Sequence, residues 1–413
     1  MLRSSLGFHT MTLDISLTNT DVHKLLLDFM EYGKTTALKM YRYKEDKYIT
    51  YFPSPDYIPT DIKTYFDSED KGIHWHIYSD DRFLCMTYII EATINPKILA
   101  GITDYLTAAT YGDMDCAIAN FDCISNKISP LLKKFINYRI KRVDYCINIC
   151  LDDFNPTYDP EQIMNLIKRS DIPPHYKEWM EYDKTSHRMK SKPESFYLCS
   201  KSVNINCYSK YLQLLNHSEE NIEKGYDPIP QEIIDASRSI IRFEVQCKYF
   251  KTYALNKKAE ISGNHRLNKY ESLLSPLTCF EIVSSYYERV VERGDWYSLP
   301  EAVRIIQSKN FNSQKEKRLI DALKYVSQCR SVAKARASCQ DYRLFNTLTD
   351  LERLNINPVT IPREWNIKHI PNFLRAYFDE LIKDFPDLEI SDGNLHTLQG
   401  YLEHCRIFKY YPI

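Results

Sequence analysis

Three stretches in the middle of the chain alternate apolar and polar side chains with a period of two, and they limit the fold more than any other feature. They are 140–152 (IKRVDYCINICLD), 195–211 (SFYLCSKSVNINCYSKY) and 239–250 (SIIRFEVQCKYF). A period of two is typical of a β-strand with one buried face. We therefore expect strands of one sheet, each with an apolar face that helices cover and an opposite polar face.

The remaining patterns place helices around this sheet and then after it. We expect further strands at 12–17 and in 72–94, the latter a hairpin that turns at 79–81. Helical patterns occupy 20–34, 96–111, 159–171, 278–294, 298–309, 313–329 and 342–355. The sequence thus predicts an α+β protein: an antiparallel or mixed central sheet with helices on one face, followed by a mainly helical C-terminal domain. We place the sheet domain at 1–270 and the helical domain at 271–413.

Composition and cysteine usage narrow the setting in which the chain works. Its 413 residues carry a net charge of −1, so any attraction for a charged polymer must be local. The 12 cysteines form no CxxC pair and fall singly within apolar runs, which is typical of reduced thiols inside cells. An N-terminal apolar region and runs of about 18 apolar residues are both missing from the sequence. We expect a cytoplasmic protein without a membrane partner.

Two acids and a tyrosine stand out on the polar faces of the three strands. Asp144 lies in the first, Tyr208 and Lys210 in the second, and Glu244 in the third. Carboxylates are ligands for Mg²⁺ or Mn²⁺, which would polarise a phosphate. A nearby cation favours the phenolate form of tyrosine, and Lys210 would supply part of that field. The alternative is that both acids are solvated strand charges, each paired with the arginine two residues before it.

Three motifs, in order, resemble those of rolling-circle replication initiators. They are 141–149 (KRVDYCINI), 195–214 (SFYLCSKSVNINCYSKYLQL) and 240–248 (IIRFEVQCK). The resemblance is to the Rep_trans family of Gram-positive plasmids and conjugative elements. Its motifs read Arg-hydrophobic-Asp, then Tyr-hydrophobic-Gly-x-x-x-Ser running into Ile-Tyr-x-Lys, then Arg-aromatic-Glu. The segment 89–101 (IIEATINPKILAG) also resembles part of phage gene II/X-type replication proteins.

The resemblance implies a role for each matching residue. Tyr208 would attack a phosphodiester at a replication origin and leave a 5′-phosphotyrosine and a free 3′-OH. Asp144 and Glu244 would hold Mg²⁺ or Mn²⁺, with Glu91 as a third carboxylate, and Lys210 would contact the phosphate or the phenolate. The sequence departs from the family pattern at Cys199, where glycine is usual, and at Asn148, where an acid often stands.

Basic segments border each of the three strands and are expected to meet DNA. They are 132–142, 184–192 and 248–270, and their lysines and arginines would neutralise phosphates. We expect DNA contacts from Arg142, Arg242, Lys248, Lys141, His74 and His76. The helical domain is a candidate winged-helix or helix-turn-helix reader of duplex DNA. The partners implied are an origin with a single-stranded or hairpin nick site, a host helicase and polymerase, and a second copy in a homodimer.

His74 and His76 also raise the question of a second kind of metal site. They lie one residue apart in a predicted strand, IHWHIY (73–78), as in nucleases with a His-hydrophobic-His motif. Imidazole favours softer metals than a carboxylate cluster does. We therefore expect both histidines to face DNA or solvent rather than to bind metal.

Two other functions remain open on sequence grounds. A conjugative relaxase makes the same covalent intermediate as an initiator, so these motifs do not separate them. A sequence-specific DNA-binding protein without nicking activity would keep the fold but not the reaction.

Overall fold

The structure is a computed structural model. It describes residues 4–35, 39–44, 47–50, 64–68, 72–80, 87–102, 105–183, 188–190, 195–223, 226–261, 269–339 and 343–383. Parts of the predicted basic segments 184–192 and 248–270 lie outside these residues. Asp81, in the predicted hairpin turn, also lies outside them.

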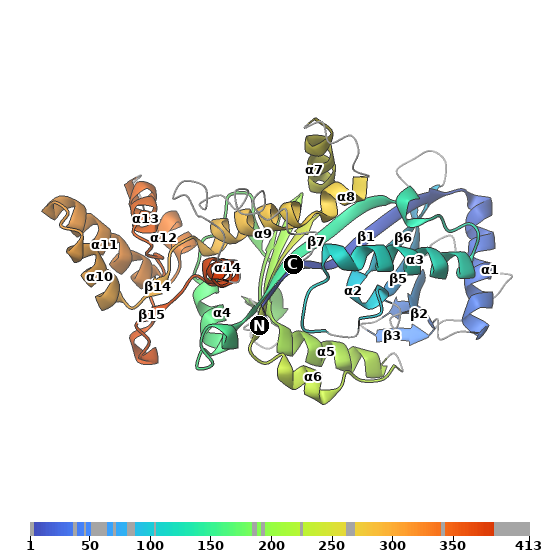
Figure 1. Cartoon of the computed structure of the whole chain (residues 1–413), viewed down its shortest axis with the longest axis horizontal. Coiled ribbons are helices and arrows are strands. Elements are labelled where there is room, and N and C mark those ends of the chain that lie inside the picture. The colour runs from blue at the N-terminus through green and yellow to red at the C-terminus, as the bar shows by residue number, and fades with distance from the viewer. Residues whose placement is uncertain are drawn as a thin grey trace.

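An antiparallel sheet of 11 strands runs through the molecule (Figure 1). Its strand order is β3-β2-β4-β5-β6-β1-β7-β13-β12-β11-β8. The strands are β1 (Ser5–Leu17), β2 (Lys39–Lys44), β3 (Lys47–Thr50), β4 (Thr64–Ser68), β5 (Ile73–Asp80), β6 (Thr87–Ile94), β7 (Arg139–Cys150), β8 (Lys177–Glu178), β11 (Ser195–Cys199), β12 (Val203–Ser209) and β13 (Ile240–Cys247). A two-stranded arm of β9 (Glu181–Asp183) and β10 (Arg188–Lys190) stands outside it. The sheet and the helical region after it confirm the predicted α+β class.

Helices cover the apolar face of the sheet along most of its length (Figure 1). They are α1 (Asn19–Thr35), α2 (Pro96–Leu99), α3 (Met114–Ile128), α4 (Pro160–Lys168), α8 (Lys269–Leu274) and α9 (Pro276–Val291). Helix α7 (Tyr249–Ile261) follows β13, contacts β7, β13 and α8, and projects from the body of the protein (Figure 1). Val143, Tyr145 and Ile147 of β7 are fully buried beneath them, as the alternation predicts. On β13, Phe243 packs edge-on against Tyr287 of α9, with ring centroids 5.1 Å apart.

Two helices pack on the polar side instead. α5 (Lys210–Glu223) follows β12 directly and contacts both β12 and β13, and α6 (Gln231–Ala236) packs against α5 (Figure 1). Leu214, Ile229 and Ile234 form a small apolar cluster between them, separate from the main core. The polar face is therefore roofed at this end of the sheet and forms a cleft there.

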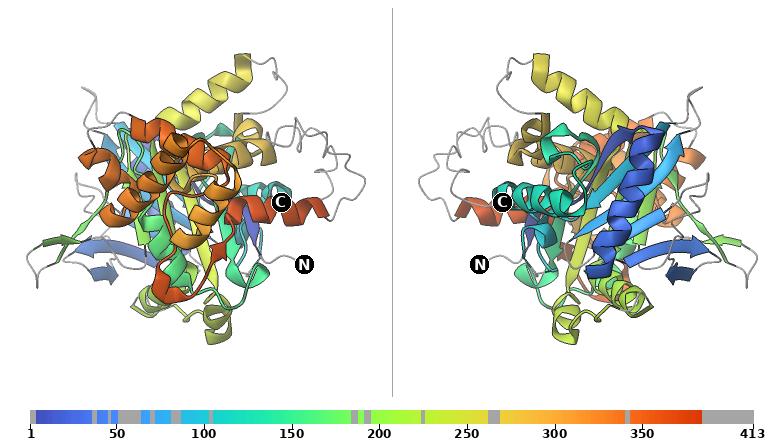
Figure 2. Two further views of the ribbon diagram at one scale, coloured as in Figure 1. Left: turned by 90° about the vertical axis from the view of Figure 1, so that its left-hand side faces the viewer. Right: turned by 90° about the vertical axis from the view of Figure 1, so that its right-hand side faces the viewer.

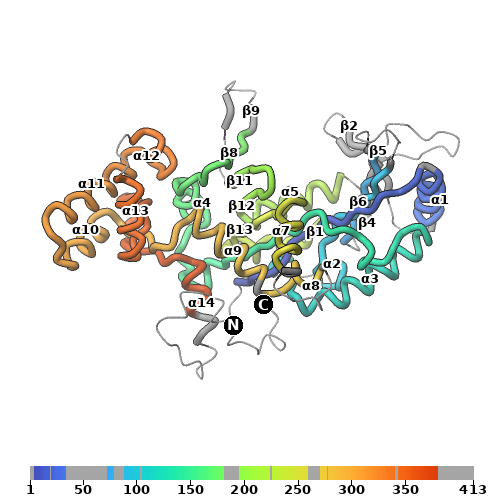
Figure 3. Tube along the Cα trace, turned by 90° about the horizontal axis from the view of Figure 1, so that it is seen from above, coloured from blue at the N-terminus to red at the C-terminus, as the bar shows by residue number. Residues whose placement is uncertain are grey.

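The C-terminal helices gather at one end of the molecule, and α1 lies at the other (Figures 1 and 3). They are α10 (Leu299–Ser308), α11 (Ser313–Cys329), α12 (Val332–Ser338), α13 (Arg343–Arg353) and α14 (Phe373–Lys383), with a short ribbon of β14 (Trp296–Tyr297) and β15 (His369–Ile370). Helix α9 lies beyond residue 270 but packs on the sheet through Tyr287. The boundary between 270 and 271 thus stays a prediction, as does the duplex-reading role. Among the described residues, none of the helices has the length and apolar character needed to cross a membrane.

Two predicted elements differ from the structure. The helix predicted at 96–111 is wrong beyond its first turn: α2 ends at Leu99, and Gly101 follows with a φ of 83°. A glycine in this left-handed region terminates a helix, here with its N–H bonded to the carbonyl of Ile98. The hairpin predicted in 72–94 does form, but β5 continues through Ser79 and Asp80, where the turn was predicted.

Gly7 fixes the position of β1 beside the segment that follows α2. A Cβ on Gly7 would lie 2.1 Å from the carbonyl oxygen of Ala109, and Phe8 and Ala109 exchange backbone hydrogen bonds of 2.8 and 3.0 Å there. We expect Gly7→Ala to lower the free energy of unfolding by about 1–3 kcal/mol, because backbone must move to relieve the clash. Chemical denaturation measures this.

Gly112→Ala is the matched control. A Cβ at Gly112 would have only the Thr110 hydroxyl within 4 Å, at 3.6 Å, and the residue lies in a short helical turn. Its free energy of unfolding should change by less than about 0.5 kcal/mol. Equal effects of the two substitutions would contradict the close-approach explanation.

Candidate active site on the polar face

The strand register brings the predicted site residues together. Tyr208 of β12 lies opposite Arg242 of β13, which lies opposite Asn148 of β7. Glu244 lies two residues further along β13 and Asp144 lies on β7 opposite Gln246. Because side chains two residues apart share a face, Tyr208, Glu244 and Asp144 all project from the same side of the sheet.

A bulge in β1 adds two residues that sequence reasoning missed. Phe8 pairs with Tyr145 and Met11 pairs with Val143, so His9 and Thr10 together face Asp144. A bulge of this kind directs two consecutive side chains to one face. The sequence carries a signal for it, because the buried residues change from Leu6 and Phe8 to Met11 and Leu13, a spacing of three within an alternating run.

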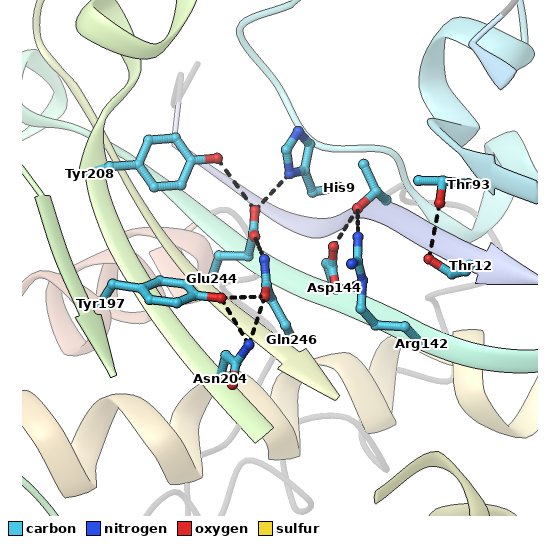
Figure 4. Close-up of polar contacts among 11 residues, drawn as sticks. His9, Thr12, Thr93, Arg142, Asp144, Tyr197, Asn204, Tyr208, Glu244 and Gln246 are labelled. Atoms are coloured by element: carbon cyan, nitrogen blue, oxygen red, sulfur yellow. Dashed lines mark hydrogen bonds and ion pairs between the residues drawn. The ribbon is translucent and has the colours of Figure 1, made fainter. Parts of the chain in front are cut away.

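Glu244 is the shared acceptor at the centre of the site (Figure 4). Its Oε2 accepts a hydrogen bond from the Tyr208 hydroxyl at 3.3 Å and lies 2.6 Å from Nδ1 of His9, and its Oε1 accepts from the amide of Gln246 at 2.9 Å. The residue is only 2% exposed. Burial raises the pKa of Glu244, but the His9 ring and the Arg242 guanidinium outweigh it and hold the pKa at about 2.

The charge on Glu244 fixes the tautomer of His9. Burial and the positive charge of Arg242 lower the pKa of His9 to about 4, so the ring is neutral at pH 7. An ionised carboxylate only accepts, and Nδ1 must therefore carry the ring proton. This leaves the lone pair of Nε2 available to accept a hydrogen bond or to bind a cation.

Asp144 lies beside this centre and is fully buried. It accepts a hydrogen bond from the Thr10 hydroxyl, and its Oδ1 lies 2.9 Å from Nε of Arg142. Burial raises the pKa of Asp144 to about 7; Arg142 opposes this rise and the negative charge of Glu244 adds to it. The pairing with Arg142 agrees with the alternative that sequence reasoning left open, but Asp144 is buried rather than solvated, and both residues line the cavity described below.

The phenol of Tyr208 is 9% exposed, and its pKa lies well above 10. Burial is the main cause and the charge of Glu244 adds to it, whereas Arg242 lowers the pKa. Arg242 is therefore a cation that acts on this phenol, and the role of Lys210 stays a prediction. Lys210 is 3% exposed and donates to Gln213 at 2.7 Å in the first turn of α5.

A cavity of about 640 Å³ opens over these residues. Its floor is formed by residues of the sheet and one wall by α5, with Leu212, Gln213, Asn216, His217 and Glu220. At its edge stands Trp179, which is 49% exposed and packs edge-on against Tyr197 at 6.4 Å. Tyr197 also accepts a hydrogen bond from Asn204 and donates one to Gln246, at 2.8 and 3.2 Å (Figure 4).

The other predicted site residues have partners that differ from those expected. Arg242, predicted to contact DNA, is 1% exposed and donates to Asn148 at 2.6 Å, so it is buried in the site instead of facing solvent. Glu91, predicted as a third carboxylate for the metal, forms an ion pair with Lys141 and accepts from the Tyr78 hydroxyl at 3.4 Å. Lys248 donates to the carbonyl of Ser200 at 2.6 Å.

The predicted strand face of His74 and His76 is present in β5. Ile73, Trp75 and Ile77 are fully buried on one side of the strand, and the two histidines alternate with them. His74 pairs across the sheet with Thr93, and His76 pairs with Glu91. Neither histidine lines the cavity that contains Tyr208.

The oxygen ligands available in the site are of the kind that a hard divalent cation binds. Asp144 and Glu244 supply carboxylate oxygens, and Oδ1 of Asp144 is buried without a well-directed hydrogen bond. In the part of the chain that the structure describes, however, no three His, Cys, Asp or Glu side chains are already grouped as a metal site. Glu91 is engaged with Lys141 and would not complete one.

Comparisons with known proteins give one structural likeness. No protein-family model and no curated protein matches the sequence. A solved structure of the rolling-circle replication initiator protein from Geobacillus stearothermophilus is similar over 70% of this chain and 85% of that chain, with 10% identity and a TM-score of 0.28. Membership of the Rep_trans family stays a prediction, and we base the function on the site and the sequence motifs.

The tautomer of His9 can be tested by NMR. With a pKa lowered to about 4, the ring should stay neutral between about pH 5 and pH 8, and its ¹⁵N shifts should report a protonated Nδ1 and an unprotonated Nε2. In Glu244→Gln the neighbouring amide can accept or donate, so this tautomer preference should be lost. A ring that gains its proton within that pH range in the wild type would contradict the assignment.

Proposed function

We propose that this chain nicks and rejoins one strand of DNA at a replication origin through a 5′-phosphotyrosine on Tyr208, and so starts rolling-circle replication. The observation that carries the proposal is the hydrogen bond of 3.3 Å from the Tyr208 hydroxyl to Glu244, within a cavity that Asp144 and Arg142 also line. The order of the three motifs, which resembles that of initiators, supports it. A conjugative relaxase would use the same chemistry.

In the proposed step the Tyr208 oxygen bonds to phosphorus and the bond from phosphorus to the 3′-oxygen breaks. The phenol is protonated at rest because its pKa is raised, so its proton must pass to a base as the new bond forms. Glu244 already accepts that proton in a hydrogen bond. The departing 3′-oxygen takes up the proton that Glu244 received from the phenol, and rejoining is the same exchange of esters in reverse.

Arg142 is the side chain we assign to the phosphate. Its side chain is 34% exposed, it lines the cavity, and it donates to Thr10 at 3.3 Å as well as pairing with Asp144. A guanidinium placed in this way balances charge on a phosphate oxygen as the nucleophile approaches.

A divalent cation, Mg²⁺ or Mn²⁺, would be held by Asp144 and Glu244. When bound, such an ion polarises the phosphate and favours the phenolate form of a neighbouring tyrosine. Glu91 is left out of this assignment because of its ion pair with Lys141.

Substitution of Tyr208 is the direct test of the nucleophile. Tyr208→Phe removes the attacking oxygen, so nicking of a supercoiled plasmid that carries the element's own origin should fall by about 1,000-fold or more. With a strand labelled on the 3′ side of the nick, in the fragment that keeps the 5′-phosphate, only the wild type should give a labelled covalent DNA–protein species on a denaturing gel.

Tyr197→Phe is the matched control for this substitution. Tyr197 lines the same cavity but bonds Asn204 and Gln246 rather than Glu244, so its loss should cost less than about tenfold. A covalent species that survives Tyr208→Phe would place the nucleophile elsewhere.

The metal assignment can be tested by substituting two carboxylates, Asp144 and Glu91, of which only Asp144 is assigned to the metal. We expect a chelator to stop nicking, Mg²⁺ or Mn²⁺ to restore it, and Asp144→Asn to abolish it at every metal concentration. Glu91→Gln should leave the metal dependence within about threefold of the wild type, because Glu91 bonds Lys141. Equal loss in both variants would return Glu91 to the metal site.

A DNA-binding protein without nicking activity is the second candidate, and the 9% exposure of Tyr208 is the observation that favours it. Tight binding of the origin by wild-type protein that never nicks it, with either metal, would decide for this candidate.

A further inference from the structure

Helix α7 begins with a group of exposed aromatic side chains that the site does not use. Tyr249, Phe250 and Tyr253 are 37%, 55% and 58% exposed. The ring centroid of Tyr249 lies 5.6 Å from that of Phe250 and 6.3 Å from that of Tyr253. Figure 2 shows α7 standing away from the body of the protein. Exposed rings grouped in this way are typical of a binding surface.

Cations accompany the rings. The guanidinium of Arg139 lies 5.0 Å from the ring centroid of Tyr249, and Nζ of Lys201 lies 5.2 Å from that of Phe250. The segment 248–258 (KYFKTYALNKK) carries lysines and no acid. A groove of about 660 Å³ beside the rings is lined by Arg139, Tyr249, Tyr253 and Lys257, among others.

The rings are not needed to hold the helix in place. Thr252 and Leu255 face inward: Leu255 packs against the main core, and Thr252 is 1% exposed, with its hydroxyl 3.4 Å from the carbonyl of Ile140 and 3.0 Å from that of Tyr249. Truncating the exposed rings should therefore remove a surface without unfolding α7.

We infer that Tyr249, Phe250 and Tyr253, with Arg139 and Lys201, form a stacking platform for single-stranded DNA. Unpaired bases stack on aromatic rings and on guanidinium planes, and the lysines neutralise the backbone between them. Duplex DNA does not fit this surface as well, because its bases already stack on each other. The identity of the strand rests on the proposed function: it is the strand beside the nick.

One strand, β13, connects the cavity to the platform along the chain. Gln246 lines the cavity of Tyr208, β13 ends at Cys247, and α7 begins at Tyr249. A strand whose phosphate occupies the cavity could thus continue onto α7. The platform would retain the unpaired strand beside the cavity while the covalent bond exists.

Binding without cleavage tests the platform. In Tyr208→Phe protein, fluorescence anisotropy would give the Kd for a labelled oligothymidylate of about 16 nucleotides at fixed salt. Adding Tyr249→Ala, Phe250→Ala and Tyr253→Ala should weaken binding by about tenfold or more, whereas Tyr249→Phe with Tyr253→Phe should stay within about twofold. Circular dichroism would verify that α7 and the fold persist.

Phe345→Ala is the matched control, because this ring is 61% exposed on α13 and also lies beneath an arginine, Arg336, at 5.3 Å. It should leave the Kd unchanged. Loss confined to the α7 rings supports the platform. Unchanged binding in the triple variant, an equal loss for duplex DNA, or tighter binding of oligouridylate than of oligothymidylate would each overturn it as a site for single-stranded DNA.

Nicking is measured separately so that the two proposals can fail independently. Wild-type protein that never nicks but binds oligothymidylate through the α7 rings would overturn the nicking reaction and leave the platform in place. Protein that nicks yet binds single strands equally well without the rings would overturn the platform alone.

Discussion

The site depends on one buried charge. Glu244 is 2% exposed, and moving a carboxylate out of water costs several kcal/mol unless donors replace the water. His9, Tyr208 and Gln246 replace it, from strands β1, β12 and β13. The same contacts that make the charge tolerable therefore also aim the phenol and fix the histidine tautomer, so the order of the site and the stability of the charge have one cause.

Strand bulges determine which residues reach this charge. At the first bulge, His9 and Thr10 both direct their side chains to the polar face, where a regular strand would direct only one. A second register shift sets Thr12 opposite Arg142 and Leu13 opposite Ile140. That shift places Lys141 and Arg142 together on the polar side, where Lys141 pairs with Glu91 and Arg142 with Asp144. The two register shifts between β1 and β7 thus bring His9, Lys141 and Arg142 to the polar face.

The alternation in the sequence was sufficient to predict which face carries Tyr208, Asp144 and Glu244, because a period of two leaves each side chain only two directions. It was not sufficient for His9, since the first strand was predicted from residue 12 and the bulge lies before it. Burial of Arg242 was also missed, because alternation reports a face but not whether a helix such as α5 roofs it. Glu91 was assigned to the metal from the resemblance of its segment to phage-type initiators. Its pairing with Lys141 could not be predicted, because the strand order, which places β1 between β6 and β7, depends on pairing over long sequence separations.

In the proposed function, the buried site and the exposed platform would carry out two tasks with opposite requirements. Proton transfer from a phenol benefits from a site of low dielectric constant, in which donors and acceptors are held in place. Binding of single-stranded DNA needs exposed aromatic rings and lysines that can reach its phosphates. With a net charge of −1 the whole protein exerts little attraction on DNA, so affinity must come from local contacts such as those on α7. Because stacking on the rings adds to the ionic contacts of the cations beside them, α7 would hold an unpaired strand more tightly than a basic surface without rings.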